Sequence, residues 1–253
     1  MTFVDTCPCC GSDDIPISQV ITIDDKPHLY CSICADCGVN FLNPRMTEER
    51  TSEYYQGEYR DKIGMVFNKT DLARQRDRAL LHGAVLKRFG VTGKSVLEVG
   101  SSIGYLLHVL HASGFTDCKG IEPDERYRAA EPACNYPMFD DISDVPPQAF
   151  DLVVMSHSLE HINTPLDYLR NLIDRYTHNE TYFLIEVPNI DINPNYWIHH
   201  PINFNEHSLN GLFERLGCEH IGNFTHGLNI IDPRSYLVGV YQNVLLDKAS
   251  GIL

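Results

Sequence analysis

The sequence has no apolar run long enough to cross a membrane. Its longest apolar stretches, such as Ser95–Val99 and Asp151–Met155, have the length of a β-strand, whereas a membrane-spanning helix needs about 20 apolar residues. The N-terminus has neither a basic flank nor an apolar stretch, so the sequence shows no signal peptide. We therefore expect a cytoplasmic protein without a membrane span.

Basic residues are scarce. The chain has 20 Lys and Arg against 34 Asp and Glu, a formal net charge of −14 at pH 7, and no cluster of Lys or Arg offsets it. Most of such a surface repels a phosphate backbone. The charge therefore argues against a nucleic-acid partner, although a local basic patch on an acidic protein would still allow one.

The cysteines are concentrated at one end of the chain. Nine are present, and six of them fall within the first 37 residues. An odd number clustered in this way indicates a reducing compartment and a metal site rather than a disulfide framework. With 253 residues and a hydrophobic fraction of 43%, the chain is long enough for one main domain and a small appendage.

Four of these cysteines form two C-x-x-C units, each followed by glycine. Such a turn places two thiolates about 3.5–4 Å apart, which suits a tetrahedral zinc ion. The glycine lets the chain curl so that backbone amides point at the sulfurs. The predicted zinc ligands are Cys7, Cys10, Cys34 and Cys37.

Other interpretations of the cysteines stay open. Cys9 and Cys31 are left over, and Cys31-x-x-Cys34 offers an alternative register. The thiols could also be reduced and buried without a metal. Redox catalysis is disfavoured, because no thioredoxin-like βαβ unit surrounds either pair.

The sequence divides into three zones. Residues 1–45 form a zinc-ribbon-like module with four cysteine ligands, residues 46–92 a helical cap or linker, and residues 93–253 the main domain. Within the second zone, a helix over residues 71–89 ends at Gly90. Its apolar face is predicted to contain Leu72, Ala79, Leu80, Ala84 and Phe89.

The third zone alternates strands and helices. We predict strands at 95–99, 118–122, 151–155 and 181–187, with helices at 105–112, 124–133 and 165–176 between them. A helix at 208–216, capped by Gly217, precedes an antiparallel pair at 218–224 and 235–242. Repeated βα units imply a parallel sheet with helices on both faces. Residues 188–206 are predicted to form a long loop, and such loops are often functional.

The end of the first predicted strand has the features of a ligand-binding turn. Gly100 permits a sharp bend, and Gly104 permits a close approach at the start of the following helix. Glu122 ends the second strand about 20 residues on, where an acidic side chain typically binds ribose hydroxyls. Glu98 is an acid in an apolar strand, which suggests a cationic partner such as the ammonium group of an amino-acid cofactor.

Two other interpretations apply to this turn. The glycines could serve only a tight strand-to-helix connection. The G-x-G-x-x-G fingerprint is not met, because Ser102 and Ile103 interrupt it, and this argues against a nicotinamide or flavin enzyme.

Four segments in order resemble the motifs of class I S-adenosylmethionine-dependent methyltransferases, over roughly residues 46–243. They are Ser95–Gly104, Gly120–Asp124, Phe150–Ile162 and Leu184–Asn189. The resemblance implies a Rossmann-like α/β fold with a seven-stranded, mostly parallel sheet, helices on both faces and a small N-terminal zinc-ribbon knob. It also implies S-adenosylmethionine as the cofactor.

The resemblance assigns cofactor-binding roles by position. Glu98, Gly100, Ser101 and Gly104 would line the methionine and ribose side, and Glu122 would hold the ribose hydroxyls. Asp141 would meet the adenine edge, and Ser156 and His157 would lie beside the cofactor. Ser102 stands where the family usually has a glycine.

The N-terminal half narrows the resemblance. The run Cys34–Arg45 and the tyrosines Tyr54, Tyr55 and Tyr59 are similar to a subgroup with an N-terminal zinc ribbon. This subgroup is related to the deoxysugar C-methyltransferases and to enzymes of glycan and capsule pathways. It implies a structural zinc and a tyrosine-rich segment that covers the substrate. The chain lacks the long C-terminal domain of the sugar C-methyltransferases, so O-methylation is expected as readily as C-methylation.

Methyl transfer requires a base near the acceptor, and histidine is the usual one. The stretch His200–Phe204 is similar to the His-x-x-x-Phe stretch of related enzymes, in which the histidine is the base. We therefore assign the catalytic role to His200, with His161 and Tyr55 as supporting contacts. The other candidates are His157, His199 and His207. Any of these histidines could instead be merely packed or solvated, and His199, His200 and Glu206 could form a second metal site.

Three functions fit these features. The first is methylation of a small-molecule acceptor related to carbohydrate: a sugar, a sugar nucleotide or a surface-glycan precursor. The second is methylation of RNA, with the zinc ribbon contacting the nucleic acid. The third is a non-catalytic scaffold that keeps the fold and binds partners through the ribbon.

Overall fold

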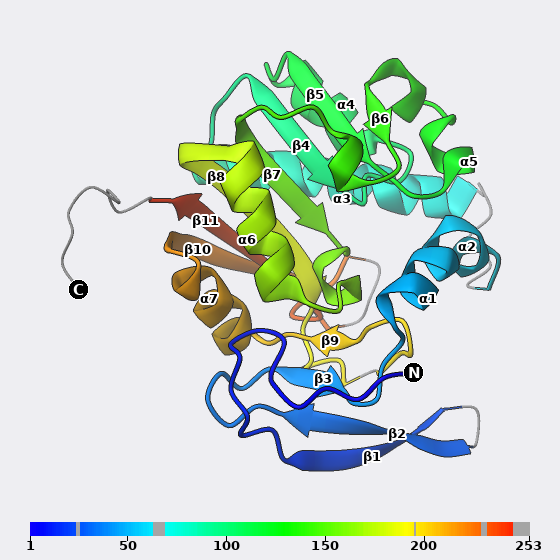
Figure 1. The fold of residues 1–253 in the computed structure, drawn as a ribbon. Helices are drawn as coiled ribbons and strands as arrows, with labels where there is room; N and C mark the ends of the chain where they lie inside the picture. The colour runs from blue at the N-terminus through cyan, green and yellow to red at the C-terminus, as the bar shows by residue number, and fades with distance from the viewer. Residues whose placement is uncertain (24–25, 63–68, 195, 229–231, 245–253) are drawn as a thin grey trace.

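The computed structural model describes residues 1–23, 26–62, 69–194, 196–228 and 232–244 (Figure 1). Two sheets organise them, one of seven strands and one of four. No helix in these ranges is long and apolar enough to cross a membrane.

The larger sheet has the order β10-β11-β8-β7-β4-β5-β6. Its strands pair in parallel from β8 to β6, whereas β11 runs antiparallel to both β8 and β10. This confirms the predicted seven-stranded, mostly parallel sheet and its terminal antiparallel pair. The short β6 was not predicted. The strands are β4 (Ser95–Val99), β5 (Asp117–Ile121), β6 (Met138–Phe139), β7 (Phe150–Ser156), β8 (Thr177–Pro188), β10 (Cys218–His226) and β11 (Tyr236–Asn243).

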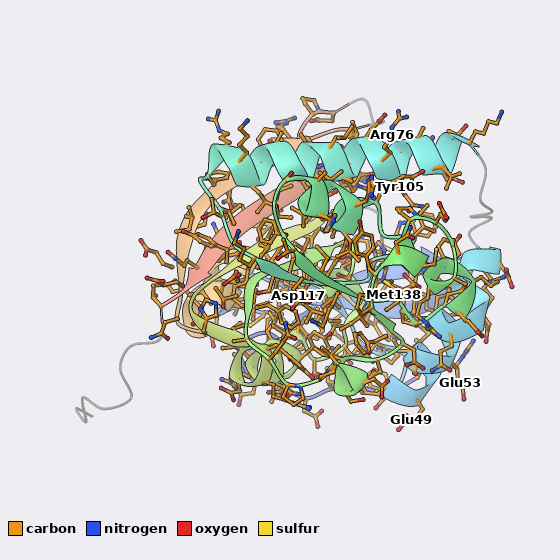
Figure 2. The ribbon with its side chains drawn as sticks, turned by 90° about the horizontal axis from the view of Figure 1, so that it is seen from above. Glu49, Glu53, Arg76, Tyr105, Asp117 and Met138 are labelled. Atoms are coloured by element: carbon orange, nitrogen blue, oxygen red, sulfur yellow. The ribbon has the colours of Figure 1, made fainter. Side chains whose placement is uncertain are left out.

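Helices cover both faces of this sheet. Successive strand side chains point to opposite faces, so Val96 packs with α3 (Lys69–Arg88) and α4 (Tyr105–Ala112), while Leu97 packs with α6 (Pro165–Tyr176) and α7 (Glu206–Arg215). Figure 2 shows α3 extended along its face, with Arg76 on it and Tyr105 at the start of α4 close by. The core therefore has two apolar layers separated by the sheet.

The predicted apolar face of α3 was wrong in part. Leu80 is 55% exposed, and Ala84 is also exposed. The buried positions are Ala79, His82, Val85 and Leu86, which share a helix face at spacings of three and four residues. His82 occupies a core position on this face. A prediction that counts only apolar residues does not include it and therefore assigns the wrong face.

The predicted helix at 124–133 is also shorter than expected. The structure has α5 over Glu125–Arg128 and a separate 3-10 turn, η2, over Ala133–Asn135. Pro132 lies between them, where its missing amide and ring prevent a continuous helix. Two further 3-10 turns, η3 (Ile142–Asp144) and η4 (Leu159–His161), follow β6 and β7.

The smaller sheet joins the N-terminus to the predicted 188–206 loop. Its order is β1-β2-β3-β9, formed by Ile17–Ile23, Lys26–Ile33, Asn40–Leu42 and Ile202–Asn203. Because β9 comes from the segment after β8, that segment is partly a strand rather than only a loop. Side chains of both sheets share one apolar cluster, so the N-terminal module is fused to the main core.

A short helical run connects the two sheets. It consists of α1 (Glu48–Glu53), the π-helical turn η1 (Tyr54–Glu58) and α2 (Tyr59–Lys62). The Thr47 side chain caps α1 by accepting from the Arg50 amide, and π-helical turns are frequent at functional sites. The run contains three tyrosines, Tyr54 and Tyr55 in η1 and Tyr59 in α2, and Figure 1 shows its helices α1 and α2 at one side of the molecule.

Candidate active site

A cavity of about 750 Å³ lies at the carboxyl ends of the parallel strands. Its wall combines the turn after β4, the end of β5, the turn after β7, one face of α3 and the tyrosines of η1 and α2. In open α/β sheets this edge is the usual ligand site. Seven of the eight predicted cofactor residues and the three predicted catalytic residues thus line one cavity.

The turn between β4 and α4 adopts a strained, tight conformation. Gly100 has a φ value of +78°, as expected for the predicted sharp bend, and Gly104, for which a close approach was predicted, has a φ value of +74°. Between them, Ser102 also has a positive φ of 50°, although it is not glycine. Its amide donates to Glu122 Oε2 at 3.0 Å and its hydroxyl donates to Gln75 Oε1 at 3.1 Å, which holds the left-handed backbone in place.

Two buried carboxyl groups face this turn. Glu122 accepts from the amides of Ser102 and Asp124 at 3.0 and 3.1 Å. Glu98 is 4% exposed, and its Oε2 has no hydrogen-bond partner among the described residues. Burial and the neighbouring charge of Glu122 raise the pKa of Glu98 well above its usual range. An uncompensated buried acid in a cavity wall is ready for a cationic ligand.

The remaining cofactor candidates are divided between the cavity and its rim. Asp141 begins η3, where its carboxylate accepts from the amide and hydroxyl of Ser143 at 2.8 and 2.6 Å. Ser156 ends β7. Seven of the eight predicted residues line the cavity: Glu98, Gly100, Ser101, Glu122, Asp141, Ser156 and His157.

Gly104 is the one predicted cofactor residue outside the cavity lining. A Cβ at this position would lie 2.9 Å from the Cα of Ala133. The absence of a side chain therefore lets η2 pack against the start of α4, which is a structural reason for this glycine.

The predicted catalytic residues lie together in the cavity. His161 Nδ1 is 2.5 Å from the Tyr55 hydroxyl and 2.8 Å from the carbonyl oxygen of His199. The Tyr55 hydroxyl donates to the same carbonyl at 2.9 Å. Since a carbonyl only accepts, Nδ1 of His161 carries the proton, and in the neutral ring Nε2 carries the lone pair.

His200 and Glu160 complete this group. The ring centroids of His161 and His200 are 4.7 Å apart, and Glu160 Oε1 is 3.9 Å from His161 Nε2. Burial and the charge of His161 lower the pKa of His200 to about 2. Burial would raise the pKa of Glu160, but the charge of His161 and the hydrogen bond from His157 lower it to about 2. The site thus presents a neutral imidazole beside an ionised carboxylate.

His157 has a more structural position than the sequence suggested. Its Nε2 donates to Glu186 Oε1 at 2.7 Å and its Nδ1 donates to Glu160 Oε1 at 3.1 Å. Burial and Arg78 oppose protonation, but Glu186 and Glu160 outweigh them and raise the pKa of His157. With a positive φ of 54°, the residue bridges two carboxylates at the cavity wall.

The group around Glu186 was not predicted from the sequence. This carboxylate is fully buried at the end of β8 and contacts His82, with Arg78 Nε at 3.2 Å and His226 Nε2 at 3.5 Å. Burial would raise the pKa of Glu186, but its cationic neighbours lower it well below the usual range. Glu160 and Glu186 both lay within recognised motif segments, and an acid inside an apolar run was the available signal.

Aromatic side chains line the cavity beside His161. Tyr55 and Tyr59 line it with ring centroids 4.9 Å apart. Trp197 lines it from the segment after β8 and is 53% exposed. These rings offer flat apolar surfaces next to the polar histidines.

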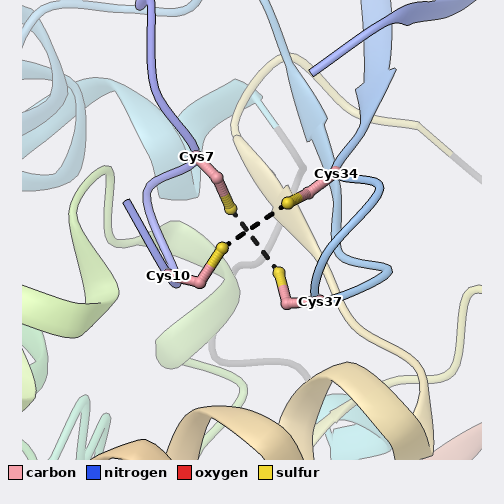
Figure 3. Close-up of side chains that lie close together, drawn as sticks. All are labelled: Cys7, Cys10, Cys34 and Cys37. Atoms are coloured by element: carbon pink, nitrogen blue, oxygen red, sulfur yellow. Dashed lines mark hydrogen bonds between the residues drawn. The ribbon is translucent and has the colours of Figure 1, made fainter. Parts of the chain in front are cut away.

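The four predicted zinc ligands converge at one point in the N-terminal module (Figure 3). Cys7 Sγ and Cys37 Sγ are 3.6 Å apart, and Cys10 Sγ and Cys34 Sγ are 3.5 Å apart. A regular tetrahedron of thiolates around zinc has sulfur–sulfur distances of about 3.8 Å. The four donors therefore fit this ion.

The rest of the module supports the same register. Gly11 and Gly38 have φ values of +80° and +70°, as predicted for the glycine after each pair. The spare Cys31 lies in β2, where its thiol contacts Asn40 Oδ1 at 3.7 Å. The four-cysteine group contains Cys37 and not Cys31, so the alternative Cys31-x-x-Cys34 register is not the one used.

Comparisons with known proteins show the family and the fold of the chain. The model of a family described as a methyltransferase domain matches residues 71–235. No curated protein matches the sequence. The three solved structures described below have identities under 25%. Their similarity to this chain therefore shows the fold.

The plantazolicin methyltransferase BpumL, solved in complex with SAH, is 13% identical, with a TM-score of 0.56 over 77% of this chain and 94% of BpumL. A chain of the complex between the Haloferax volcanii Trm112 methyltransferase activator and a methyltransferase is 16% identical, with a TM-score of 0.57 over 79% of this chain and 100% of that one. An S-adenosylmethionine-dependent methyltransferase from Mesorhizobium loti is 12% identical, with a TM-score of 0.51 over 63% of this chain and 96% of that one.

The protein is thus an S-adenosylmethionine-dependent methyltransferase of class I. Since the family model spans more than half of the chain, the chain belongs to the methyltransferase domain family.

Proposed function

We propose that this enzyme methylates an oxygen, or alternatively a carbon, of a carbohydrate-related acceptor such as a sugar, a sugar nucleotide or a surface-glycan precursor. The observation that carries the proposal is the single cavity that joins the acidic turn after β4 to the histidines after β7 and β8. A methyl donor and an acceptor bound in its two halves would meet between them.

The cofactor half suits S-adenosylmethionine. Glu98 offers an unpartnered buried carboxyl oxygen to a cationic group, and Glu122 is a carboxylate, fixed by two amide contacts, at the strand end where ribose hydroxyls are bound. Asp141 would meet the adenine edge, and Ser156 and His157, which also line the cavity, would lie beside the cofactor. When bound, the cofactor supplies an already activated methyl group.

The acceptor half would then align the nucleophile and help remove its proton. We assign these roles to His200 and His161, with Tyr55 fixing the orientation of the His161 ring. The low pKa of His200 makes its ring a hydrogen-bond acceptor that stays neutral, but a weak base by itself. Glu160, which was not predicted from the sequence, places a carboxylate oxygen 3.9 Å from His161 Nε2.

A carbohydrate fits the acceptor end better than a polyanion does. Sugar rings have apolar faces that stack on aromatic side chains, and Tyr55, Tyr59 and Trp197 supply such faces beside polar groups. The net charge of −14 argues against RNA. A peptide-like acceptor is the alternative, since the similar BpumL is a plantazolicin methyltransferase.

The N-terminal module would have a structural zinc ion. We propose residues 1–45 as the four-cysteine module, 46–92 as the cap and 93–253 as the cofactor-binding domain. The four cysteines belong to the same apolar cluster as the end of β8, or pack against it, so the ion would fix β3 and β9 beside the cavity. Nine free cysteines agree with a reducing compartment, and we propose the cytoplasm.

The acceptor class can be tested by following a labelled methyl group. Zinc-loaded protein is incubated with methyl-labelled S-adenosylmethionine and three pools: sugar nucleotides and glycan precursors, azole-containing peptides, and RNA. Label in the first pool, with a mass increase of one methyl group, supports the proposal. Label confined to the peptide or RNA pool overturns it.

The catalytic assignment has its own test. His200→Ala is expected to abolish methyl transfer while leaving the affinity for S-adenosylhomocysteine unchanged, because His200 lies in the acceptor half. His220→Ala is the matched control, since His220 is exposed on β10 and bonds to Asn223 at 3.0 Å. Turnover that survives in His200→Ala would place the base elsewhere.

A further inference from the structure

Three side chains in the acceptor half form a metal-binding constellation. One ligand atom from each of Glu160, His161 and His200 lies within 4.8 Å of the other two. All three residues line the cavity. Two imidazoles and a carboxylate are a common ligand set for divalent transition metals that keep open coordination positions.

The hydrogen bonding of these residues prepares them to bind a cation. His161 donates its Nδ1 proton to the His199 carbonyl at 2.8 Å, so its Nε2 carries the lone pair, and metal-bound histidines are typically oriented by such a carbonyl. Glu160 is 1% exposed, and its Oε2 has no partner among the described residues. A buried carboxylate oxygen without a donor is costly unless a ligand compensates it.

A second candidate cluster, His82, Glu186 and His226, is less suitable. The Arg78 guanidinium already contacts Glu186 at 3.2 Å, which repels a metal ion. The Leu228 amide donates to His226 Nδ1 at 3.2 Å, so the neutral ring of His226 carries its proton on Nε2, the atom that would face a metal. The cation of Arg78 and the proton on His226 Nε2 therefore make this cluster the weaker metal-site candidate of the two.

We propose that Glu160, His161 and His200 bind one divalent transition-metal ion, and that this ion holds the acceptor through a hydroxyl oxygen and a neighbouring oxygen. The proposal rests on the proposed function and narrows it to O-methylation of a chelating acceptor, such as a vicinal diol or an α-hydroxy carbonyl. Nitrogen and carboxylate donors distinguish this site from the four thiolates of the N-terminal module, which prefer zinc.

A His200 ring that coordinates the ion has no free lone pair for the acceptor proton, so in this arrangement His200 would position the ion and the ion would acidify the acceptor hydroxyl. The acceptor hydroxyl binds the ion and its O–H proton passes to a water molecule. A new C–O bond then forms as the C–S bond of the cofactor breaks, and that electron pair stays on sulfur as a neutral thioether. A bound cation lowers the pKa of a coordinated hydroxyl in the same way that it lowers that of water.

Titration of zinc-loaded, full-length protein with Mn²⁺ and with Co²⁺ tests the site without an acceptor. Calorimetry and the Mn²⁺ paramagnetic resonance signal should show one ion bound per chain beyond the zinc. Glu160→Gln and His200→Ala should each weaken this binding at least about tenfold. His226→Gln, a change in the other cluster, should leave it unaltered.

The affinity for S-adenosylhomocysteine is measured on the same samples and shows whether each variant is folded. It also distinguishes failure of the proposed metal site from failure of the proposed methyltransferase function. Tight cofactor binding with no ion bound, or ion binding that neither variant weakens, overturns the metal site and leaves the methyltransferase assignment intact. Loss of ion binding in His226→Gln, but not in Glu160→Gln or His200→Ala, would move the site to the other cluster and also overturn the proposal. Absence of cofactor binding by the unmodified protein contradicts the proposed function itself.

Discussion

The buried carboxyl group of Glu98 gives the sharpest prediction. Because burial and Glu122 raise its pKa well above the usual range, the folded, cofactor-free protein favours the protonated, neutral form of Glu98. Glu98→Gln then replaces one neutral group by another of nearly the same shape. At pH values between the pKa of Glu98 in the unfolded chain and its raised pKa in the folded protein, the folded state binds more protons than the unfolded state. The free energy of unfolding of the unmodified protein therefore falls as pH rises through this range. We expect the variant to be at least as stable at pH 7.

Cofactor binding should respond in the opposite direction. A charged hydrogen bond from the cofactor ammonium to the Glu98 carboxylate contributes about 1.5–3 kcal/mol, so its loss weakens binding by about 10–150-fold. S-adenosylmethionine and S-adenosylhomocysteine both have this ammonium group and should weaken alike. The affinity of the unmodified protein should rise with pH as Glu98 ionises, whereas that of Glu98→Gln should be flat.

Isothermal titration calorimetry across pH 6–9 (about the range in which a raised carboxyl pKa is visible), together with urea unfolding, measures both effects. Asp117→Asn is the control: it removes a charge from the opposite end of β5, where Asp117 is bound by Lys119 and Gln148 at 2.5 and 2.8 Å (Figure 2). An unchanged affinity in Glu98→Gln, or a large loss of stability without cofactor, would refute the reasoning.

Three further changes test other parts of the structure. Asp151 accepts from the amides of Lys94 and Ser95 at 2.6 and 2.9 Å, and these bonds outweigh burial and lower its pKa to about 2. The contribution of ionised Asp151 to stability is present above pH 3.8 and is lost as pH falls toward about 2. In urea unfolding, Asp151→Asn should therefore lower the free energy of unfolding by about 1–2 kcal/mol at pH 7 and by much less at pH 2.5. An equal loss at both pH values contradicts this. Cys10→Ser should remove the zinc, measured by elemental analysis, and lower the melting temperature; a full zinc complement would exclude the four-thiolate site. Glu186→Gln should destabilise the protein by about 3–5 kcal/mol, because it leaves buried cations unpaired, and a change under about 1 kcal/mol would show that the buried group is not ionised.

The sequence was most informative where local chemistry repeats. Alternating strand and helix patterns predicted the sheet and both of its covered faces, because burial on two sides makes parallel strands continuously apolar. The two C-x-x-C-Gly units predicted the convergence of four thiolates, since the geometry of each turn is encoded within a few neighbouring residues. The turn after β4 was predicted for the same reason.

The sequence was least informative where one side chain serves two elements. The face of α3 was misassigned because His82 is buried only by pairing with Glu186 on β8, and that partner lies 104 positions away. The helix after β5 was predicted too long, although Pro132 was a visible signal. The His200 segment was recognised, but its strand β9 and its pairing with β3 could not be found from so short a pattern.

The order of elements, the glycine bend and the cysteine spacing were therefore properties of the chain itself, because each depends on residues within a few positions of one another. The cavity, the low pKa of His200 and the grouping of Glu160 with His161 and His200 were decided by the tertiary structure. They depend on burial and on distances between segments that are far apart in the sequence, and a local pattern contains neither quantity.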